Sequence, residues 1–269
     1  MIPRVLTIAG SDAGGGSGIQ GDLKTFTVLG TYGLSVITAL TAQNTLGVQA
    51  IADVEARFVA AQLDSVLGDI GADAVKTGMM NTREVIEVVA DALERYKVPH
   101  IVVDPVMIAK SGHRLLREDA VRVMKERLLP LASVVTPNIE EAAILADIPP
   151  IEDARGMGEA AKEIVALGAR AVIVKGGHLL GDTSDDLWFN GKEMVMLSSP
   201  RFDKRHTHGT GCAFSAALAA YLAKGLYFIE ATRYAKNFVS EAIRTAESIG
   251  SGNSPVNHLW QKTVKTSIG

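Results

Sequence analysis

Cysteine is almost absent from this chain, since Cys212 is the only one among 269 residues. A single cysteine excludes an internal disulfide framework and fits a reducing compartment. A strong charge of one sign is also lacking, because the net charge at pH 7 is −3 and no basic stripe runs along the sequence. Nucleic-acid binding therefore has no electrostatic support, whereas an acidic small substrate needs only a local field.

A hydrophobic run long enough for a bilayer is lacking as well. The longest run of small and apolar residues, CAFSAALAAYLA, stops at Lys224, short of the roughly 20 residues that a membrane-spanning helix needs. The first residues, MIPRVLTIAG, lead directly into a polar, glycine-rich loop, which is not the pattern of a secretory signal. We expect a soluble, cytoplasmic protein with neither nucleic acid nor membrane as a partner.

Short β-branched runs alternate with helical patterns along the chain. The runs are nearly all apolar, as in parallel strands buried on both faces, and they lie at 4–10, 35–43, 72–78, 100–106, 133–138 and 170–177. The helical patterns lie at 55–70, 81–97, 116–129, 138–147, 154–167, 210–224 and 227–248. Asn190-Gly191 predicts the turn of a β-hairpin within 185–197. The alternation predicts a doubly wound α/β fold, and the lack of a linker predicts one domain over 1–269.

Polar residues and glycines stand where each predicted strand ends. In open parallel sheets, ligands bind beyond these carboxyl ends. The ends here are Gly10-Ser11-Asp12, Gln43-Asn44, Lys76-Thr77-Gly78, Asp104-Pro105, Pro137-Asn138 and Lys175-Gly176-Gly177. Such an edge is typical of an enzyme more than of a scaffold.

The first glycine loop, GSDAGGGSGIQGD at 10–22, contains the string GSGIQG that dinucleotide-binding folds use. Such a site needs a carboxylate about 20 residues further on, and none stands between Asp22 and Asp53. A P-loop is also excluded, because the only Gly-Lys pair, at 191–192, is followed by glutamate. The loop fits either a turn that needs glycine geometry or, with Asp12 and Asp22, a site for a polar small molecule.

The second glycine loop, HGTGC at 208–212, precedes an alanine-rich helix that is apolar nearly all round. The start of such a buried helix presents unpaired N–H groups and the positive end of a dipole, so it binds anions. The same field lowers a thiol pKa, and we expect Cys212 to be partly thiolate near neutral pH. The alternatives are a small core cysteine or a zinc ligand beside His208, for which further cysteines are lacking.

Other polar groups have ordinary interpretations beside the functional ones. Asn138 and Glu141 fit a helix capping box. Asp104 fits either a strand end that Pro105 terminates or a partner of a metal-bound phosphate. The pair Asp185-Asp186 is expected to lie in a solvated turn, and His206 and His208 fit a solvated loop.

Taken in order, seven stretches closely resemble the hydroxymethylpyrimidine phosphate kinases of thiamin biosynthesis, a family of the ribokinase-like superfamily. They are TIAGSDAGGGSGIQGDLKTF, TALTAQNT, KTGMM, VVDPVMIAKSG, VTPNIEEA, VKGGH and THGTGCAFSAALAA. The resemblance implies a three-layer α/β/α sandwich with a mainly parallel sheet, and a homodimer. It implies transfer of the γ-phosphate of ATP, with Mg2+, to 4-amino-5-hydroxymethyl-2-methylpyrimidine and then to its monophosphate.

The resemblance also implies roles for single residues. Cys212 would be the base, where most ribokinase-like sugar kinases carry aspartate, and Gly209, Thr210 and Gly211 would supply N–H groups of the anion hole. On the substrate side the implied residues are Gln43 for the ring nitrogen and amino group, Gly10 and Asp22 for holding the ring, and Met79 and Val106 for packing on it. On the phosphate side the resemblance implies that Lys175 contacts the phosphates. It implies that Asn138 and Glu141 position Mg2+ on the phosphates, with Asp104 near the ion.

Two departures from the family pattern and two rival functions remain. His206 stands where asparagine is common, and Thr77 stands where a larger aliphatic residue is usual. The nearest rival is a pyridoxal kinase of the same superfamily, against which Gln43 speaks because pyridoxal lacks the amino-pyrimidine edge. The other is a non-catalytic nucleotide-binding protein. Candidate lids are the segments 10–18 and 108–114.

Overall fold

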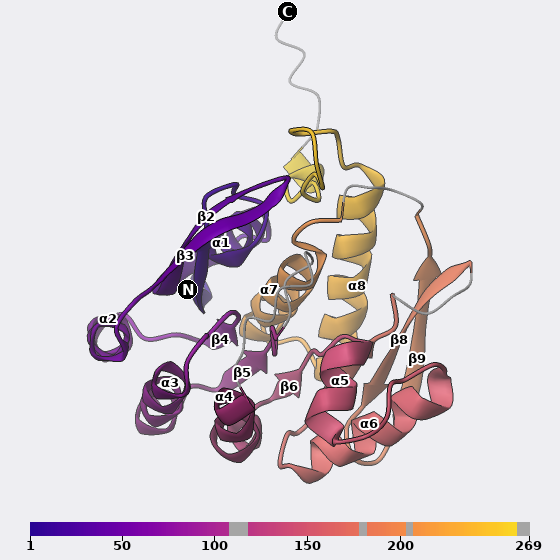
Figure 1. Ribbon diagram of the computed structural model, residues 1–269, viewed down its shortest axis with the longest axis horizontal. Helices are drawn as coiled ribbons and strands as arrows, with labels where there is room; N and C mark the ends of the chain where they lie inside the picture. The colour runs from indigo at the N-terminus through magenta and orange to yellow at the C-terminus, as the bar shows by residue number, and fades with distance from the viewer. Residues whose placement is uncertain (108–117, 178–181, 203–206, 263–269) are drawn as a thin grey trace, which may run out of the picture.

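One nine-stranded sheet organises the molecule (Figure 1), in the order β3-β2-β1-β4-β5-β6-β7-β8-β9. The computed structural model describes the chain except residues 108–117, 178–181, 203–206 and 263–269. The strands are β1 (Arg4–Asp12), β2 (Tyr32–Asn44), β3 (Gly47–Asp53), β4 (Ala74–Thr77), β5 (His100–Val103), β6 (Val134–Val135), β7 (Val172–Lys175), β8 (Thr183–Phe189) and β9 (Met194–Pro200).

The inner strands run parallel, and β3, β8 and β9 pair antiparallel at the two edges. The chain winds from β1 outward to β2 and β3, then returns to the other side of β1 to form β4 and continues in the opposite direction. Strand order therefore reverses between β1 and β4. In open α/β sheets this switch point is where ligands bind, because the neighbouring connections leave a crevice there.

Helices cover both faces of the sheet. Figure 1 shows α1 (Gly18–Val28), α7 (Thr210–Ala223) and α8 (Phe228–Arg244) on one face. The other face carries α2 (Ala56–Asp69), α3 (Arg83–Tyr96), α4 (Glu118–Val123), α5 (Ile139–Ala146) and α6 (Ala154–Ala166). Two separate apolar clusters fill the space between the sheet and each helical layer. The predicted three-layer α/β/α sandwich with a mainly parallel sheet is confirmed, while one domain over 1–269 stays a prediction.

Most predicted elements are present, including the hairpin, and two elements differ from the prediction. The hairpin of β8 and β9 turns at Asn190-Gly191, where Gly191 has φ +85. Strand β3 was not predicted, because it lies at the sheet edge with nearly all of its residues exposed and so has no apolar pattern. The helix predicted at 116–129 is α4 followed by a π-helical turn (Met124–Leu128), and its first two residues lie outside the described part.

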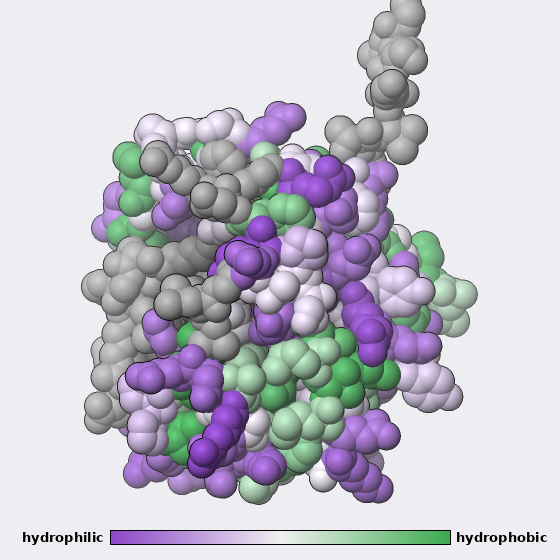
Figure 2. Space-filling model, turned by 90° about the vertical axis from the view of Figure 1, so that its right-hand side faces the viewer, coloured by the Kyte–Doolittle hydropathy of each residue, from purple (hydrophilic) through white to green (hydrophobic). Residues whose placement is uncertain are grey.

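The outer edge of the sheet ends in β9, on the face that Figure 2 shows. Hydrophilic side chains cover much of this face, with apolar groups gathered in its lower half, and the edge strand itself exposes Met194 and Met196. Within the described residues, every helix is too short or too polar to cross a bilayer.

Candidate active site

Asp12, at the end of β1, organises the first glycine loop. Its Oδ1 accepts the N–H of Gly14 at 2.8 Å, and its Oδ2 accepts N–H and O–H groups of Gly16 and Ser17 and contacts Nε2 of His208 at 2.9 Å. Burial alone would raise the pKa of Asp12, but the bonds from His208 and Ser17 outweigh burial and lower the pKa to about 2. The loop is therefore wrapped around a permanent anion.

The two glycine loops lie against each other. Gly209, the residue before α7, has φ +79, and a Cβ built on it would stand 1.8 Å from the carbonyl oxygen of Gly16. Any larger residue at position 209 would push the loops apart, so both the left-handed backbone and the close approach require glycine. The starts of α1 and α7, which the resemblance assigned to substrate and phosphate, thus form one continuous wall.

Asp104 and Lys175 meet at the ends of β5 and β7. Oδ1 of Asp104 accepts Nζ of Lys175 at 3.1 Å and the hydroxyl of Thr136 at 3.2 Å, and Oδ2 accepts the hydroxyl of Ser215 of α7 at 3.0 Å. A Cβ on Gly211 would lie 3.4 Å from Nζ of Lys175. Burial would lower the pKa of Lys175, but Asp104 and Glu141 outweigh it and raise the pKa. A fixed cation therefore stands beside the predicted anion hole.

Asn138 and Glu141 form the predicted capping box at the start of α5. The Asn138 amide oxygen accepts the Glu141 N–H at 2.8 Å, and Oε2 of Glu141 accepts the Asn138 N–H at 2.9 Å. Glu141 is only 4% exposed, and burial raises its pKa to about 7, with Asp104 adding to burial and Lys175 opposing it. Two buried carboxylates whose charges act on each other suit a bound cation, so Asp104 and Glu141, with Asn138, are residues that would be able to hold a magnesium ion.

The expectation that Cys212 is partly thiolate at neutral pH is wrong. Burial raises the pKa of its thiol above the ordinary value, and the ammonium of Lys76 opposes burial only in part. The sulfur accepts the N–H of Gly18 at the start of α1, so two helix N-termini converge on it. They do not overcome the loss of water around this half-buried side chain at the start of α7.

Lys76 is a member of the site that the sequence did not single out. Its side chain is fully buried, and Nζ lies 2.9 Å from Oδ2 of Asp22, which also accepts the hydroxyl of Thr7. Burial would lower the pKa of Lys76, but Asp22 and Cys212 outweigh it and raise the pKa. Asp22, predicted to help hold the substrate ring, is thus itself enclosed and occupied by Lys76. A lysine within the apolar run of β4 was the available signal.

A third buried pair was also missed. Asp186, expected in a solvated turn, lies in β8 with 6% exposure, and its Oδ2 accepts Nζ of Lys236 of α8 at 2.6 Å. Its Oδ1 accepts the N–H of Gly176 at 3.1 Å. The pair therefore fixes the backbone immediately after Lys175.

The remaining predicted substrate residues lie at the ends of β1, β2, β4 and β5. Gly10 closely approaches Met79, since a Cβ on Gly10 would stand 2.5 Å from the Met79 methyl group. Val106 is half-buried beside Asp104, whose carbonyl it bonds through its N–H. Gln43 is half-buried and contacts His208. Their contact with a pyrimidine stays a prediction.

The structure does not test the predictions made for the two candidate lids and for His206. The candidate lid at 108–114 and His206 lie outside the described residues, and the segment 10–18 is the loop that Asp12 holds.

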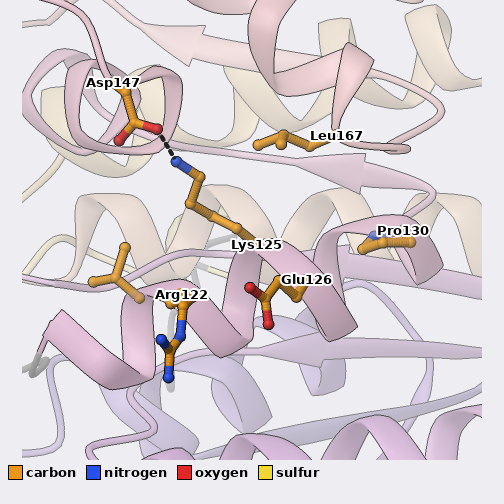
Figure 3. Close-up of a pocket in the computed structure, with 7 residues that line it drawn as sticks. Arg122, Lys125, Glu126, Pro130, Asp147 and Leu167 are labelled. Carbon is orange, nitrogen blue, oxygen red and sulfur yellow. Dashed lines mark hydrogen bonds and ion pairs between the residues drawn. The ribbon is translucent and has the colours of Figure 1, made fainter.

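Figure 3 shows a shallow hollow around Lys125, whose ammonium pairs with Asp147 at 2.5 Å. Asp147 caps the end of α5, whereas Asn138 caps its start, about 13 Å away along the helix. The hollow is therefore separate from the predicted site.

Comparison with known proteins agrees with this geometry. The family model described as phosphomethylpyrimidine kinase matches residues 12–257. The chain is 52% identical to hydroxymethylpyrimidine/phosphomethylpyrimidine kinase of Rhizobium meliloti, over 97% of this chain and 100% of that protein. It is 53% identical to the thiamine biosynthesis bifunctional protein ThiED of Geobacter sulfurreducens, over 96% of this chain but only 53% of that protein, so it spans about half of that longer relative.

Among solved structures, the ADP complex of Bacillus subtilis pyridoxal kinase has a TM-score of 0.92 and 37% identity, covering 98% of this chain and 100% of that one. The ribokinase-like fold predicted from the motifs is therefore confirmed. With the family model spanning most of the chain and a full-length relative sharing half of its residues, this protein belongs to the phosphomethylpyrimidine kinase family and is a phosphotransferase.

Proposed function

We propose that this chain uses ATP to phosphorylate 4-amino-5-hydroxymethyl-2-methylpyrimidine and then its monophosphate, in thiamin biosynthesis. The observation that carries the proposal is the meeting of the HGTGC helix start with Lys175 and Asp104 at the carboxyl ends of β5 and β7. The names of the pyrimidine kinase relatives support the substrate, and the ADP complex of a neighbouring kinase supports the nucleotide. The cytoplasmic location and the homodimer stay predictions.

The phosphate end is a set of donors at the start of α7. The N–H groups of Gly209 and Gly211 would face the transferring phosphoryl group, because the first N–H groups of a helix have no acceptor within it. The N–H of Thr210 would join them by leaving its long bond to the carbonyl of Thr207, at 3.4 Å. Nζ of Lys175 adds a full positive charge beside them. Donors fixed in place before the reaction stabilise the charge that spreads over the phosphoryl oxygens without reorganising.

Asp104, Asn138 and Glu141 would hold magnesium, partly through water or phosphate. When bound, Mg2+ neutralises charge on the phosphates. Glu141 has a pKa of about 7, so near neutral pH it holds a proton about half of the time, and a nearby cation favours its carboxylate form. Binding of Mg2+ at this site is therefore expected to release protons in this pH range.

Cys212 is the proposed acceptor of the proton of the substrate hydroxyl. Because burial raises the pKa of its thiol, the thiolate is a minor form at neutral pH, and Lys76 is the cation that stabilises it. In a loose phosphoryl-transfer transition state the hydroxyl proton leaves late, so a small thiolate population is sufficient. The turnover number is then expected to rise with pH above neutrality.

Gln43, Gly10, Met79 and Val106 form the proposed pyrimidine pocket, and Gln43 distinguishes the substrate from pyridoxal. Pyridoxal offers a phenolic oxygen and an aldehyde, so the amide would lose one of its two matched hydrogen bonds. The higher identity to the pyrimidine kinase, 52% against 37% for the pyridoxal kinase, points the same way.

A coupled assay of ADP formation with Mg2+ tests the proposal on hydroxymethylpyrimidine, its monophosphate and pyridoxal in parallel. We expect kcat/KM to be highest for one of the two pyrimidines. A higher value for pyridoxal would move the assignment to the rival kinase, and no ADP formation with any of the three would favour a non-catalytic protein.

The role of Cys212 is tested by Cys212→Ala. Loss of a general base typically lowers kcat by about 100-fold or more, with circular dichroism confirming that the fold is intact. If the variant keeps most of kcat, positioning by the anion hole accounts for the rate and the base assignment is wrong.

A further inference from the structure

The imidazole of His208 lies between the first glycine loop and the proposed substrate amide, and the mechanism above does not use it. Nε2 of His208 stands 2.9 Å from Oδ2 of Asp12 and 3.3 Å from Nε2 of Gln43. One ring nitrogen thus faces two partners with different hydrogen-bonding needs. Whether this nitrogen, Nε2, carries a hydrogen atom decides which way the amide of Gln43 is turned.

Nε2 of His208 must carry a hydrogen atom. Oδ2 of Asp12 already accepts donors from Gly16 and Ser17, and an ionised carboxylate has only acceptor sites. The imidazole therefore donates to Asp12 through Nε2–H, and this holds for the neutral ring and for the imidazolium alike. A nitrogen that donates cannot also accept from the amide nitrogen of Gln43.

Thr41 imposes the matching condition on the other side of the amide. Its Oγ1 lies 2.8 Å from the carbonyl oxygen of Ser11 and 3.3 Å from Oε1 of Gln43. The carbonyl oxygen can only accept, so the single hydroxyl hydrogen of Thr41 is directed to Ser11. Toward Gln43 the hydroxyl is then an acceptor and needs an N–H.

A half-turn of the Gln43 amide satisfies both neighbours together. Terminal amides present oxygen and nitrogen in nearly the same shape, so their orientation follows from the hydrogen-bond network. After the half-turn, the one Nε2–H of His208 is shared in a three-centre bond, mainly with Asp12 at 2.9 Å and more weakly with Oε1 of Gln43 at 3.3 Å, and the amide nitrogen donates to Oγ1 of Thr41. This leaves a lone pair on the His208 side and an N–H on the Thr41 side for a ligand.

The C-terminal segment 252–256 holds the backbones that carry this network. The N–H groups of Gly252 and Asn253 bond the hydroxyl and the carbonyl of Thr45, at 3.2 Å and 2.8 Å. His208 donates its N–H to the carbonyl of Ser254 and accepts the N–H of Val256. The turn after Gln43 and the residue that bears the imidazole are therefore fastened to one short segment.

We propose that His208, with Asp12 and Thr41, is a positioning residue that fixes the donor–acceptor polarity of Gln43 and thereby selects a 4-aminopyrimidine over a 4-oxopyrimidine. The inference rests on the proposed function, in which Gln43 reads the pyrimidine edge. A 4-amino ring offers a donor beside a ring-nitrogen acceptor, which matches the fixed amide. A 4-oxo ring offers an acceptor beside a ring N–H, the reverse order, and leaves two mismatched polar contacts.

The test is the ratio of kcat/KM for 4-amino-5-hydroxymethyl-2-methylpyrimidine to that for its 4-oxo analogue. His208→Leu and Thr41→Val each remove one constraint, and the double variant lets the amide turn freely. We expect the ratio to fall in each single variant and by about tenfold or more in the double variant. His208→Gln keeps an N–H toward Asp12 and should restore most of the ratio.

A purely structural role for His208 would lower activity on both substrates in proportion and leave the ratio unchanged, which would overturn the inference. If His208→Leu does not fold, Thr41→Val still tests the inference that the neighbours of Gln43 fix the orientation of its amide. Thr27→Val is the matched control, since Thr27 is an exposed α1 residue whose hydroxyl donates to the carbonyl of Leu23 in the same helix. The ratio of the Kd values for the 4-amino and 4-oxo pyrimidines, measured by calorimetry, repeats the test without turnover. An inactive wild type would disprove the proposed function, and the ratio of Kd values would still test the role of His208.

Discussion

Lys76 of β4 and Lys175 of β7 each pair with an aspartate near the carboxyl edge of the sheet, but water reaches only one of the two pairs. Lys76 and Asp22 have side chains that are 0% exposed, whereas Lys175 is 17% exposed beside an Asp104 that is 3% exposed. An enclosed pair has no room to exchange its partner for a ligand. A cation that water reaches has that room, so the difference in exposure agrees with the proposal that Lys76 supports the site and Lys175 binds a ligand.

The largest effect is expected from breaking the enclosed pair with Lys76→Met. The variant leaves the carboxylate of Asp22 buried without a counter-charge, which costs about 3–5 kcal/mol of the free energy of unfolding. Urea denaturation measures the loss. Adding Asp22→Asn removes the stranded charge and should recover part of it. A single variant as stable as the wild type would show that water enters the Lys76 site.

Lys175→Met tests the opposite side of the comparison. We expect kcat/KM for ATP to fall about 100-fold, because one charge-assisted contact to the phosphates is lost. Stability should change less than with Lys76→Met, since Asp104 keeps the hydroxyl groups of Thr136 and Ser215. Lys162→Met, an exposed lysine of α6, is the control. If Lys175→Met lost stability without losing activity, the two lysines would have the same role.

Glu141→Gln extends the comparison of buried charges to the pH dependence of stability. The folded-state pKa of Glu141, about 7, lies above its ordinary value of 4.5, so the folded state binds more protons than the unfolded state between these values. Its contribution to stability is present below pH 4.5 and is lost as the pH rises through 7, by about 3 kcal/mol at most. Thermal melting from pH 4.5 to 8 should show this decline in the wild type and not in Glu141→Gln, which preserves the capping box.

The control for that experiment is Glu140→Gln, an exposed neighbour in the same helical turn. It should follow the wild-type pH dependence. Equal slopes for all three proteins would mean that Glu141 ionises normally and does not share a buried site with Asp104.

The smallest effect concerns Thr77, the residue next to Lys76. Its side chain is fully buried, and its hydroxyl has no hydrogen-bond partner within the described part of the chain. Thr77→Val keeps the shape and removes the unpaired group, so we expect a gain of about 1 kcal/mol in the free energy of unfolding. Urea denaturation against Thr27→Val would reveal it, and a loss of stability would point to a bound water at this hydroxyl.

The sequence predicts this site well where the contacts are local or follow from strand order. The Asn138–Glu141 box was predictable because its partners are three residues apart. Asp104 and Lys175 are 71 residues apart, yet both end parallel strands, which all finish at the same sheet edge. Partners of Lys76 and Asp186 lie 54 and 50 residues away on helices, and no periodicity fixes which helical residue faces a strand.

The state of Cys212 could not be predicted for a different reason. A helix start and a glycine loop are visible in the sequence and favour an acidic thiol. The desolvation that outweighs them depends on how tightly α1, α7 and the sheet enclose the sulfur, which is a property of the packed molecule. Likewise β3 was missed because an exposed edge strand has no apolar pattern to detect.

The fastening of His208 by residues 252–256 has a consequence for how the enzyme is made. Asp12 leaves the ribosome well before His208, because the two residues joined by this contact are 196 positions apart in the chain. His208 in turn donates its N–H to Ser254 and accepts the N–H of Val256. A nascent chain that has not yet reached Ser254 can build the central sheet but not this junction, so the wall formed by the two glycine loops is completed only after Ser254 and Val256 have been added.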